Sequence, residues 1–121
     1  MSVWTWLGVA LLGGAGANAR FLIDWLTSAR AGGELPFCTL AVNASGSLLL
    51  GLVTGFALGG SALVLAGTAT LGSYTTFSTW MLETQRLAED AKLPAALLNV
   101  LVSLAVGVAA AALGRTIGAH A

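Results

Sequence analysis

Long apolar runs constrain the fold of this chain more than any other feature of its sequence. The run 36–58 contains no charged side chain, and further apolar runs cover 3–26, 62–82 and 94–113. A helix needs about 20 apolar residues to cross a bilayer. Only 8% of the residues are charged, against about 25% in a soluble domain, which is too few to cover a water-facing surface. We therefore expect an integral membrane protein.

The apolar runs favour helices over β-strands. Backbone groups in lipid must be satisfied internally, which leaves helices or closed barrels, and these runs lack the alternation of barrel strands. The predicted fold class is an all-α membrane protein with four transmembrane helices in a single domain, 1–121. Pro36 and Pro94 are placed to open the second and fourth helices, because a first-turn residue needs no N–H. The charged stretch 83–92 is expected to be a loop.

Small residues are the second general feature, since the chain has 16 glycines. Helices in lipid gain no hydrophobic drive from meeting each other, and small residues allow the close contact that holds them together. Gly59 and Gly60 are expected to form a short turn, and Gly114 to follow the end of the fourth helix at Leu113. Four short helices enclose little space by themselves, so an oligomer is expected.

The charged and reactive residues exclude several classes of function. The net charge is zero, without a basic tail, so a nucleic-acid surface is not expected. The single histidine, His120, lies in the C-terminal tail, so neither a catalytic triad nor a histidine metal site is expected, and the protein is predicted not to be an enzyme. The lone Cys38 cannot form an internal disulfide. Residues 1–19 contain no Lys or Arg, so the first helix is expected to be retained and not cleaved as a signal peptide.

The basic residues bear on orientation. Four of them lie toward one predicted face of the membrane and Arg115 toward the other; the four are Arg20, Arg30, Arg86 and Lys92. Such a bias would place the first and third loops inside the cell.

Polar residues within the apolar runs are the candidates for function, because polar groups at membrane depth usually face a bundle interior or a water-filled path. In the second run, Thr39, Asn43, Gly46 and Ser47 recur at helical spacing and share one face. Two interpretations stay open: hydrogen bonds that join neighbouring helices, or a permeation path.

The run 72–80 is the densest polar cluster, with six hydroxyl residues and Gly72 within nine positions. Broken helices occur in membranes where they line a cavity or expose carbonyl oxygens to an ion. The third helix is therefore expected to be broken near its middle, with a kink that binds nothing as the alternative. Phe77 and Trp80 lie three residues apart and share a face.

Two further clusters are less specific. The glycine-rich run 13–20 indicates a close helix contact and ends in Arg20. Arg20 is either an anchor at the membrane interface or a positive charge that attracts anions into a vestibule. Asn99 and Ser103, four apart in the fourth run, form a polar pair of the same kind.

Together, the runs 13–20, 39–47 and 72–79, followed by Glu83, resemble the small fluoride channels of the Fluc (CrcB) family in order, spacing and chain length. The Thr-Thr-Phe-Ser-Thr run at 75–79 is the most specific element. The resemblance implies passive, fluoride-selective conduction by an antiparallel homodimer of four-helix subunits with two pores. It also implies dual topology in the inner (plasma) membrane.

The resemblance implies roles for individual residues. Phe77 matches the pore phenylalanine, and Trp80 stands at its partner position, where the family usually has Phe. Asn43 matches the pore asparagine and Arg20 the vestibule arginine. The other implied residues of the fluoride pathway are Ser78, Thr79, Glu83 and Ser103.

A structural sodium ion at the dimer centre is also implied, held by the backbone carbonyls of Gly72 and Thr75.

The residues of the implied fluoride path have the chemistry that fluoride needs. Fluoride holds its hydration water tightly, so a dry pore must replace those hydrogen bonds, which the Asn43 amide and the Ser and Thr hydroxyls can do. Aromatic ring edges are electropositive, so the edge of Phe77 can face an anion. A fixed lysine could instead trap the ion, since conduction needs binding of intermediate strength.

Two other functions remain as alternatives. A small multidrug-type, proton-coupled exporter also has four helices, but its chemistry needs a membrane-embedded carboxylate. The first run contains no Glu, and Asp24 lies near its end. A noncatalytic assembly subunit would use the same small-residue faces for packing alone.

Overall fold

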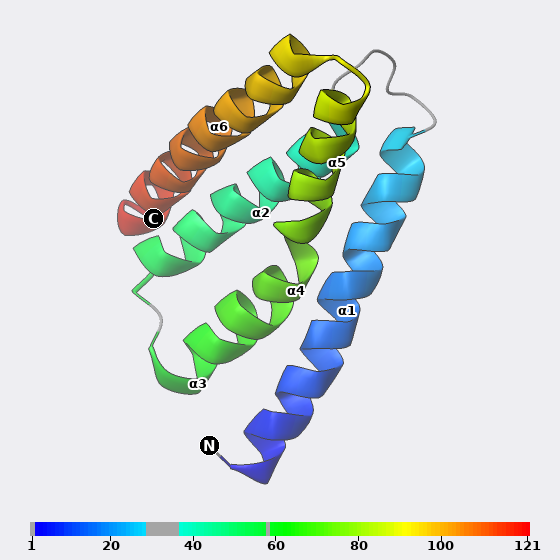
Figure 1. Cartoon of the computed structure of the whole chain (residues 1–121). Coiled ribbons are helices and arrows are strands. Elements are labelled where there is room, and N and C mark those ends of the chain that lie inside the picture. Colours follow the sequence, from blue (N-terminus) through cyan, green and yellow to red (C-terminus); the bar gives the residue numbers. More distant parts are fainter. Residues whose placement is uncertain (1, 29–36, 58) are drawn as a thin grey trace.

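The structure, a computed structural model, describes residues 2–28, 37–57 and 59–121, which form helices joined by short connections (Figure 1). The three long helices are α1 (Val3–Ser28), α2 (Phe37–Gly55) and α6 (Leu93–Ala119). Each is long and apolar enough to cross a membrane. No strand occurs in the described ranges, so the predicted all-α class is confirmed. Pro36, the expected start of the second helix, and Arg30 lie outside the described residues.

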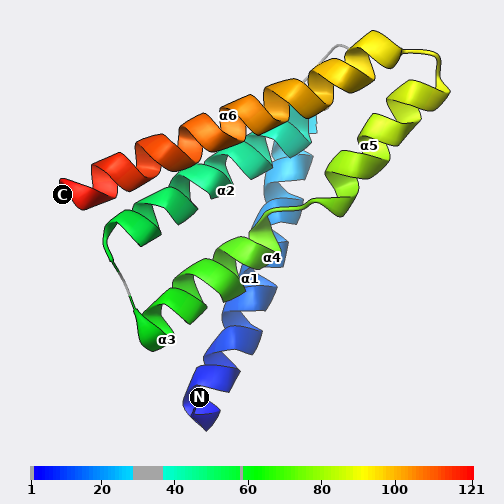
Figure 2. The ribbon, with the colours of Figure 1, turned by 60° about the vertical axis from the view of Figure 1, so that its left-hand side comes forward.

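Four shorter pieces connect α2 to α6: α3 (Gly60–Leu63), the π-helix η1 (Val64–Leu71), α4 (Gly72–Tyr74) and α5 (Ser78–Glu89). The first three follow one another directly, and η1 and α4 pack beside α1. Between α4 and α5 the chain leaves helical geometry, and Thr75 is extended, with φ −80° and ψ 161°. α5 then continues in a different direction (Figure 2).

Two predicted boundaries are wrong. The stretch 83–92 is not a loop, because α5 continues to Glu89 and leaves only 90–92 to connect it to α6. An i,i+4 hydrogen bond from Gln85 to the Glu89 carboxylate (2.9 Å) supports this last turn. The fourth helix does not end at Leu113 but continues to Ala119. Its glycines contact another helix and do not terminate their own.

α2 and α6 pack against each other along most of their lengths (Figure 1). Glycines make this contact, with Gly51 of α2 and Gly114 of α6 both buried. A Cβ atom at Gly51 would lie 2.1 Å from the Ala111 oxygen, and one at Gly114 would lie 2.0 Å from the Leu48 oxygen. The two backbones therefore touch, which is the close approach that small residues permit in lipid.

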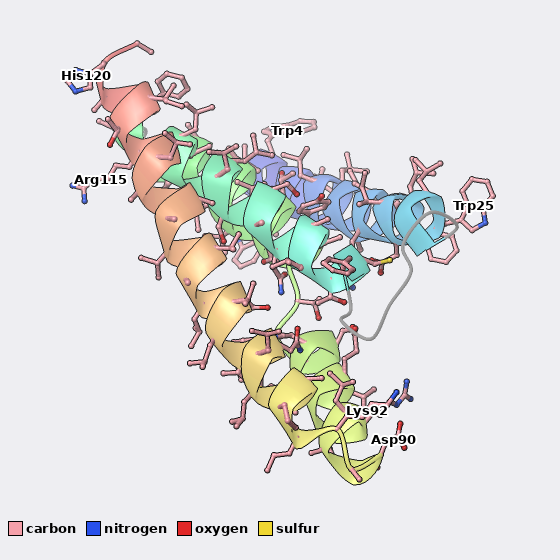
Figure 3. The ribbon with its side chains drawn as sticks, turned by 90° about the horizontal axis from the view of Figure 1, so that it is seen from above. Trp4, Trp25, Asp90, Lys92, Arg115 and His120 are labelled. Atoms are coloured by element: carbon pink, nitrogen blue, oxygen red, sulfur yellow. The ribbon has the colours of Figure 1, made fainter. Side chains whose placement is uncertain are left out.

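The outer surface suits lipid over most of its area. Trp4 and Trp25 point outward from α1 (Figure 3), with 81% and 65% of their surfaces exposed. Asp90 and Lys92 lie at the α5–α6 turn, and Arg115 lies far along α6 (Figure 3). The large apolar side chains exposed along the long helices are what a multi-pass membrane protein presents to lipid.

Candidate functional site

The non-helical residues between α4 and α5 are held by a side chain of α2. Asn43 donates from Nδ2 to the Thr76 carbonyl (2.8 Å), and its Oδ1 accepts from the Thr76 N–H (2.8 Å). One amide thereby satisfies both backbone groups of Thr76. Unsatisfied backbone groups are costly in a membrane, and the Asn43 amide leaves neither backbone group of Thr76 unsatisfied. We call the non-helical residues 75–77 the break.

Further contacts fix the neighbours of Thr76. The Thr76 hydroxyl accepts from the Thr79 N–H (3.2 Å), which caps the first turn of α5. The Thr75 carbonyl accepts from Nη1 of Arg20 in α1 (3.3 Å). The Thr75 hydroxyl donates back to the Leu71 carbonyl (3.0 Å). The break is thus held from α1, from α2 and from within its own segment.

A cavity of about 610 Å³ lies beside the break, between α2, η1, α4 and α6. Among the described residues that line it, none is charged. Its polar and aromatic lining includes Asn43, Ser47, Thr75, Phe77, Trp80 and Ser103. The Phe77 and Trp80 rings meet edge to face, with centroids 5.6 Å apart and planes at 82°. The cavity therefore joins neutral hydrogen-bond donors with aromatic edges, and both can contact an anion.

A second cavity, of about 420 Å³, is lined from α1, α2 and α5. Thr79 and Glu83 line it, together with Asp24 and Cys38. Thr39, which is 4% exposed, donates its hydroxyl hydrogen bond to the Glu83 carboxylate. This cavity is therefore acidic, unlike the larger one.

The structure divides the predicted site residues into groups. Four of them line the larger cavity (Asn43, Phe77, Trp80 and Ser103), as do the two whose carbonyls are the implied sodium ligands (Gly72 and Thr75). Thr79 and Glu83 line the smaller cavity. Ser78 is exposed and lines neither. Arg20 reaches a backbone carbonyl of the break, a contact that neither interpretation of its sequence position included.

The hydrogen-bond partner of Asn99 was not predicted from the sequence. Asn99 was paired with Ser103, but its Nδ2 donates to the Thr84 hydroxyl of α5 (2.8 Å). Asn99 is only 4% exposed, so this hydrogen bond satisfies a buried amide. The signal available in the sequence was an Asn in an otherwise apolar helix, and the partner could not be read from it.

Comparison with known proteins assigns this chain to a family. Residues 7–115 match the family described as CrcB-like protein, Camphor Resistance (CrcB). The chain is 54% identical over 114 residues to the fluoride-specific ion channel FluC 2 of Mycolicibacterium paratuberculosis, covering 94% of this chain and 93% of that relative. It is 50% identical to a FluC 2 of Mycobacterium tuberculosis over 117 residues, covering 97% and 93%. A FluC 1 of Symbiobacterium thermophilum is 41% identical over 121 residues, covering 95% and 96%. The match extends over nearly the whole chain, and the protein belongs to the CrcB-like family.

Proposed function

We propose that this protein is a fluoride-selective channel that passes fluoride passively across the inner (plasma) membrane. Its relatives are named as fluoride-specific ion channels. The observation that carries the proposal is the larger cavity, where neutral donors and an aromatic pair lie beside a break in the helical chain.

The lining of this cavity suits a small anion that has lost its water. The Asn43 amide has two N–H groups. Its hydrogen bond to the Thr76 carbonyl uses one of them, so the other is a donor for fluoride. Ser103 contributes a hydroxyl and Phe77 a ring edge. Since these groups are uncharged, they bind the ion without trapping it.

The remaining pathway residues lie at the smaller cavity and around the break. We assign Thr79 and Glu83 to a polar track at the smaller cavity. The Thr39 hydroxyl donates a hydrogen bond that orients the Glu83 carboxylate. Arg20 lies against the break and adds positive potential there. Ser78 is exposed at the start of α5. Its hydroxyl would contact the ion where a second subunit packs against this surface.

The channel is proposed to be an antiparallel homodimer, with subunits inserted in both orientations. α3, η1, α4 and α5 would together form the third membrane crossing, broken at 75–77. Phe77 supports a partner at this place, because 69% of the residue's surface is exposed although it belongs to the cavity lining. A second copy would cover this ring and complete the pore.

A structural sodium ion is proposed at the dimer centre, held by the carbonyls of Gly72 and Thr75. In a continuous helix the Thr76 N–H would bond to the Gly72 carbonyl, but here it donates to Asn43. The Gly72 carbonyl is thereby released from that bond. The Thr75 carbonyl accepts from Arg20 and has a second lone pair. Oxygen ligands of this kind suit a hard cation, and two subunits would supply four of them.

Fluoride efflux from liposomes loaded with the purified protein tests the channel assignment. We expect rapid passive fluoride efflux, with chloride slower by orders of magnitude. Asn43→Leu should abolish most fluoride flux, since it removes a donor from the cavity and both hydrogen bonds to the Thr76 backbone. Asn18→Leu is the matched control, because the Asn18 amide is exposed and bonds only to Gly14 of its own helix in the contacts described (2.8 Å). Equal fluoride and chloride fluxes would rule out the assignment.

Replacement of sodium tests the cation. Fluoride flux and thermal stability of the dimer should both fall when a large organic cation replaces sodium, and no sodium flux should accompany fluoride. Full activity and stability without sodium would exclude the proposed site.

A further inference from the structure

Trp80 belongs to a closed circuit of hydrogen bonds that connects α5 to α6. The indole Nε1 donates a long hydrogen bond to the backbone carbonyl of Asn99 (3.5 Å), and the side-chain amide of Asn99 donates to the Thr84 hydroxyl (2.8 Å). The Thr84 hydroxyl in turn donates to the Trp80 carbonyl (2.9 Å). Each of the three residues thus bonds to the other two.

The circuit is buried where it crosses between the helices. Asn99 is 4% exposed, and a buried amide that loses its partner is costly. The alternatives for this amide are poor in a membrane, because no water is available to replace Thr84. The distance between α6 at Asn99 and α5 at Thr84 is therefore well defined.

The same circuit includes the indole nitrogen of a ring that lines the larger cavity. Trp80 lines the larger cavity, whereas Asn99 and Thr84 are not among its lining residues. The indole N–H donates to the α6 backbone. The ring therefore cannot rotate to point this N–H at an ion without losing that hydrogen bond. With its nitrogen held, the ring meets Phe77 edge to face at 82°. A phenylalanine at this position has no N–H and could not be held in this way.

We propose that Thr84 and Asn99 are positioning residues that set the orientation of the Trp80 ring in the fluoride path. This inference rests on the proposed channel function and adds to it two residues that do not touch the ion. It also explains how a tryptophan is accommodated beside Phe77, because the circuit satisfies the extra N–H outside the cavity.

A double-mutant cycle separates positioning from general adhesion of the helices. Thr84→Val removes the hydroxyl but keeps the side-chain shape. It should lower fluoride flux about tenfold, the effect of one lost hydrogen bond on a rate. In the Trp80→Phe background the same change should alter flux less than about twofold, because that ring is not bound to α6. Thr84→Ser keeps the hydroxyl and should retain the original flux. Equal losses in both backgrounds would overturn the inference.

A second measurement reports on the ring itself and needs no fluoride flux. Replacing Trp4, Trp6 and Trp25 with Phe leaves Trp80 as the only indole of the chain. In that protein, Thr84→Val should shift the indole N–H resonance of Trp80 in NMR spectra, and Thr84→Ser should not. An unshifted resonance would overturn the inference. If the wild-type protein passes no fluoride, the channel assignment fails, while the resonance still decides whether Thr84 orients the ring.

Discussion

Gly114→Ala should destabilise the protein, because there is no room for a methyl group between α6 and α2. The new Cβ would lie 2.0 Å from the Leu48 oxygen and 2.9 Å from the Leu52 nitrogen. Both are backbone atoms of a helix, so neither can move aside by changing a rotamer. The closer contact is about 1.4 Å shorter than the 3.4 Å at which ordinary van der Waals contact begins.

The magnitude follows from two opposing effects. Separating the helices by this amount weakens packing along the α2–α6 contact. Overpacking typically costs 1–3 kcal/mol, and we use the upper value, about 3 kcal/mol, because the obstructing atoms are backbone atoms. Alanine is the better helix former by about 1 kcal/mol. The expected net loss in the free energy of unfolding is therefore about 2 kcal/mol.

Gly14→Ala provides the control, since it makes the same chemical change in α1 where no atom of another helix lies within 4 Å of the new Cβ. It should raise the free energy of unfolding by up to about 1 kcal/mol. Equilibrium unfolding in detergent micelles, followed by far-UV circular dichroism, measures both variants. If Gly114→Ala is as stable as Gly14→Ala, the backbone contact between α2 and α6 is not what holds these helices together.

Three further substitutions test the break and the polar track. Thr76→Val removes the cap of α5 and should lower the free energy of unfolding by about 1 kcal/mol, whereas Thr76→Ser should be neutral; equal stability of the two would contradict the cap. Glu83→Gln can still accept from Thr39, so fluoride efflux assays should show a changed rate with little change in selectivity, and an unchanged rate would place Glu83 outside the path. Arg20→Lys keeps the charge but loses the guanidinium contact to Thr75, so the unfolding temperature should fall by about 4 °C; no fall would show that the charge alone matters.

Hydropathy was sufficient to predict the three long helices but not all of their ends. Each of α1, α2 and α6 contains a long apolar window, which is a property of the local sequence. The end of α6 was predicted too early because Gly114 resembles a terminating glycine. Its actual role depends on the α2 backbone facing it. The polar composition of 83–92 predicts a loop, yet residues up to Glu89 are helical, and Gln85 and Glu89 form an i,i+4 hydrogen bond.

The candidate site was partly predictable for a related reason. Asn43 and Ser103 could be named because polar residues are conspicuous in apolar runs, whereas the roles of Phe77 and Trp80 came from the resemblance to the Fluc (CrcB) family. The structure brings all four to one cavity. Their partners could not be predicted. Asn43 and Arg20 both bond to backbone atoms of residues far along the chain, and every residue has the same backbone, so no side-chain pattern marks those atoms.

The hydrogen bonds of Asn43 to Thr76 restrict which side chains can occupy position 43. Thr76 presents one donor and one acceptor to it, so the side chain must present an acceptor and a donor in return, at the reach of a short amide. Aspartate has nearly the same shape, but one of its carboxylate oxygens, an acceptor, would face the Thr76 carbonyl oxygen, which is also an acceptor. Leucine would leave both groups of Thr76 in lipid without partners. Asparagine should therefore be required at this position even in a descendant of this protein that has stopped conducting ions.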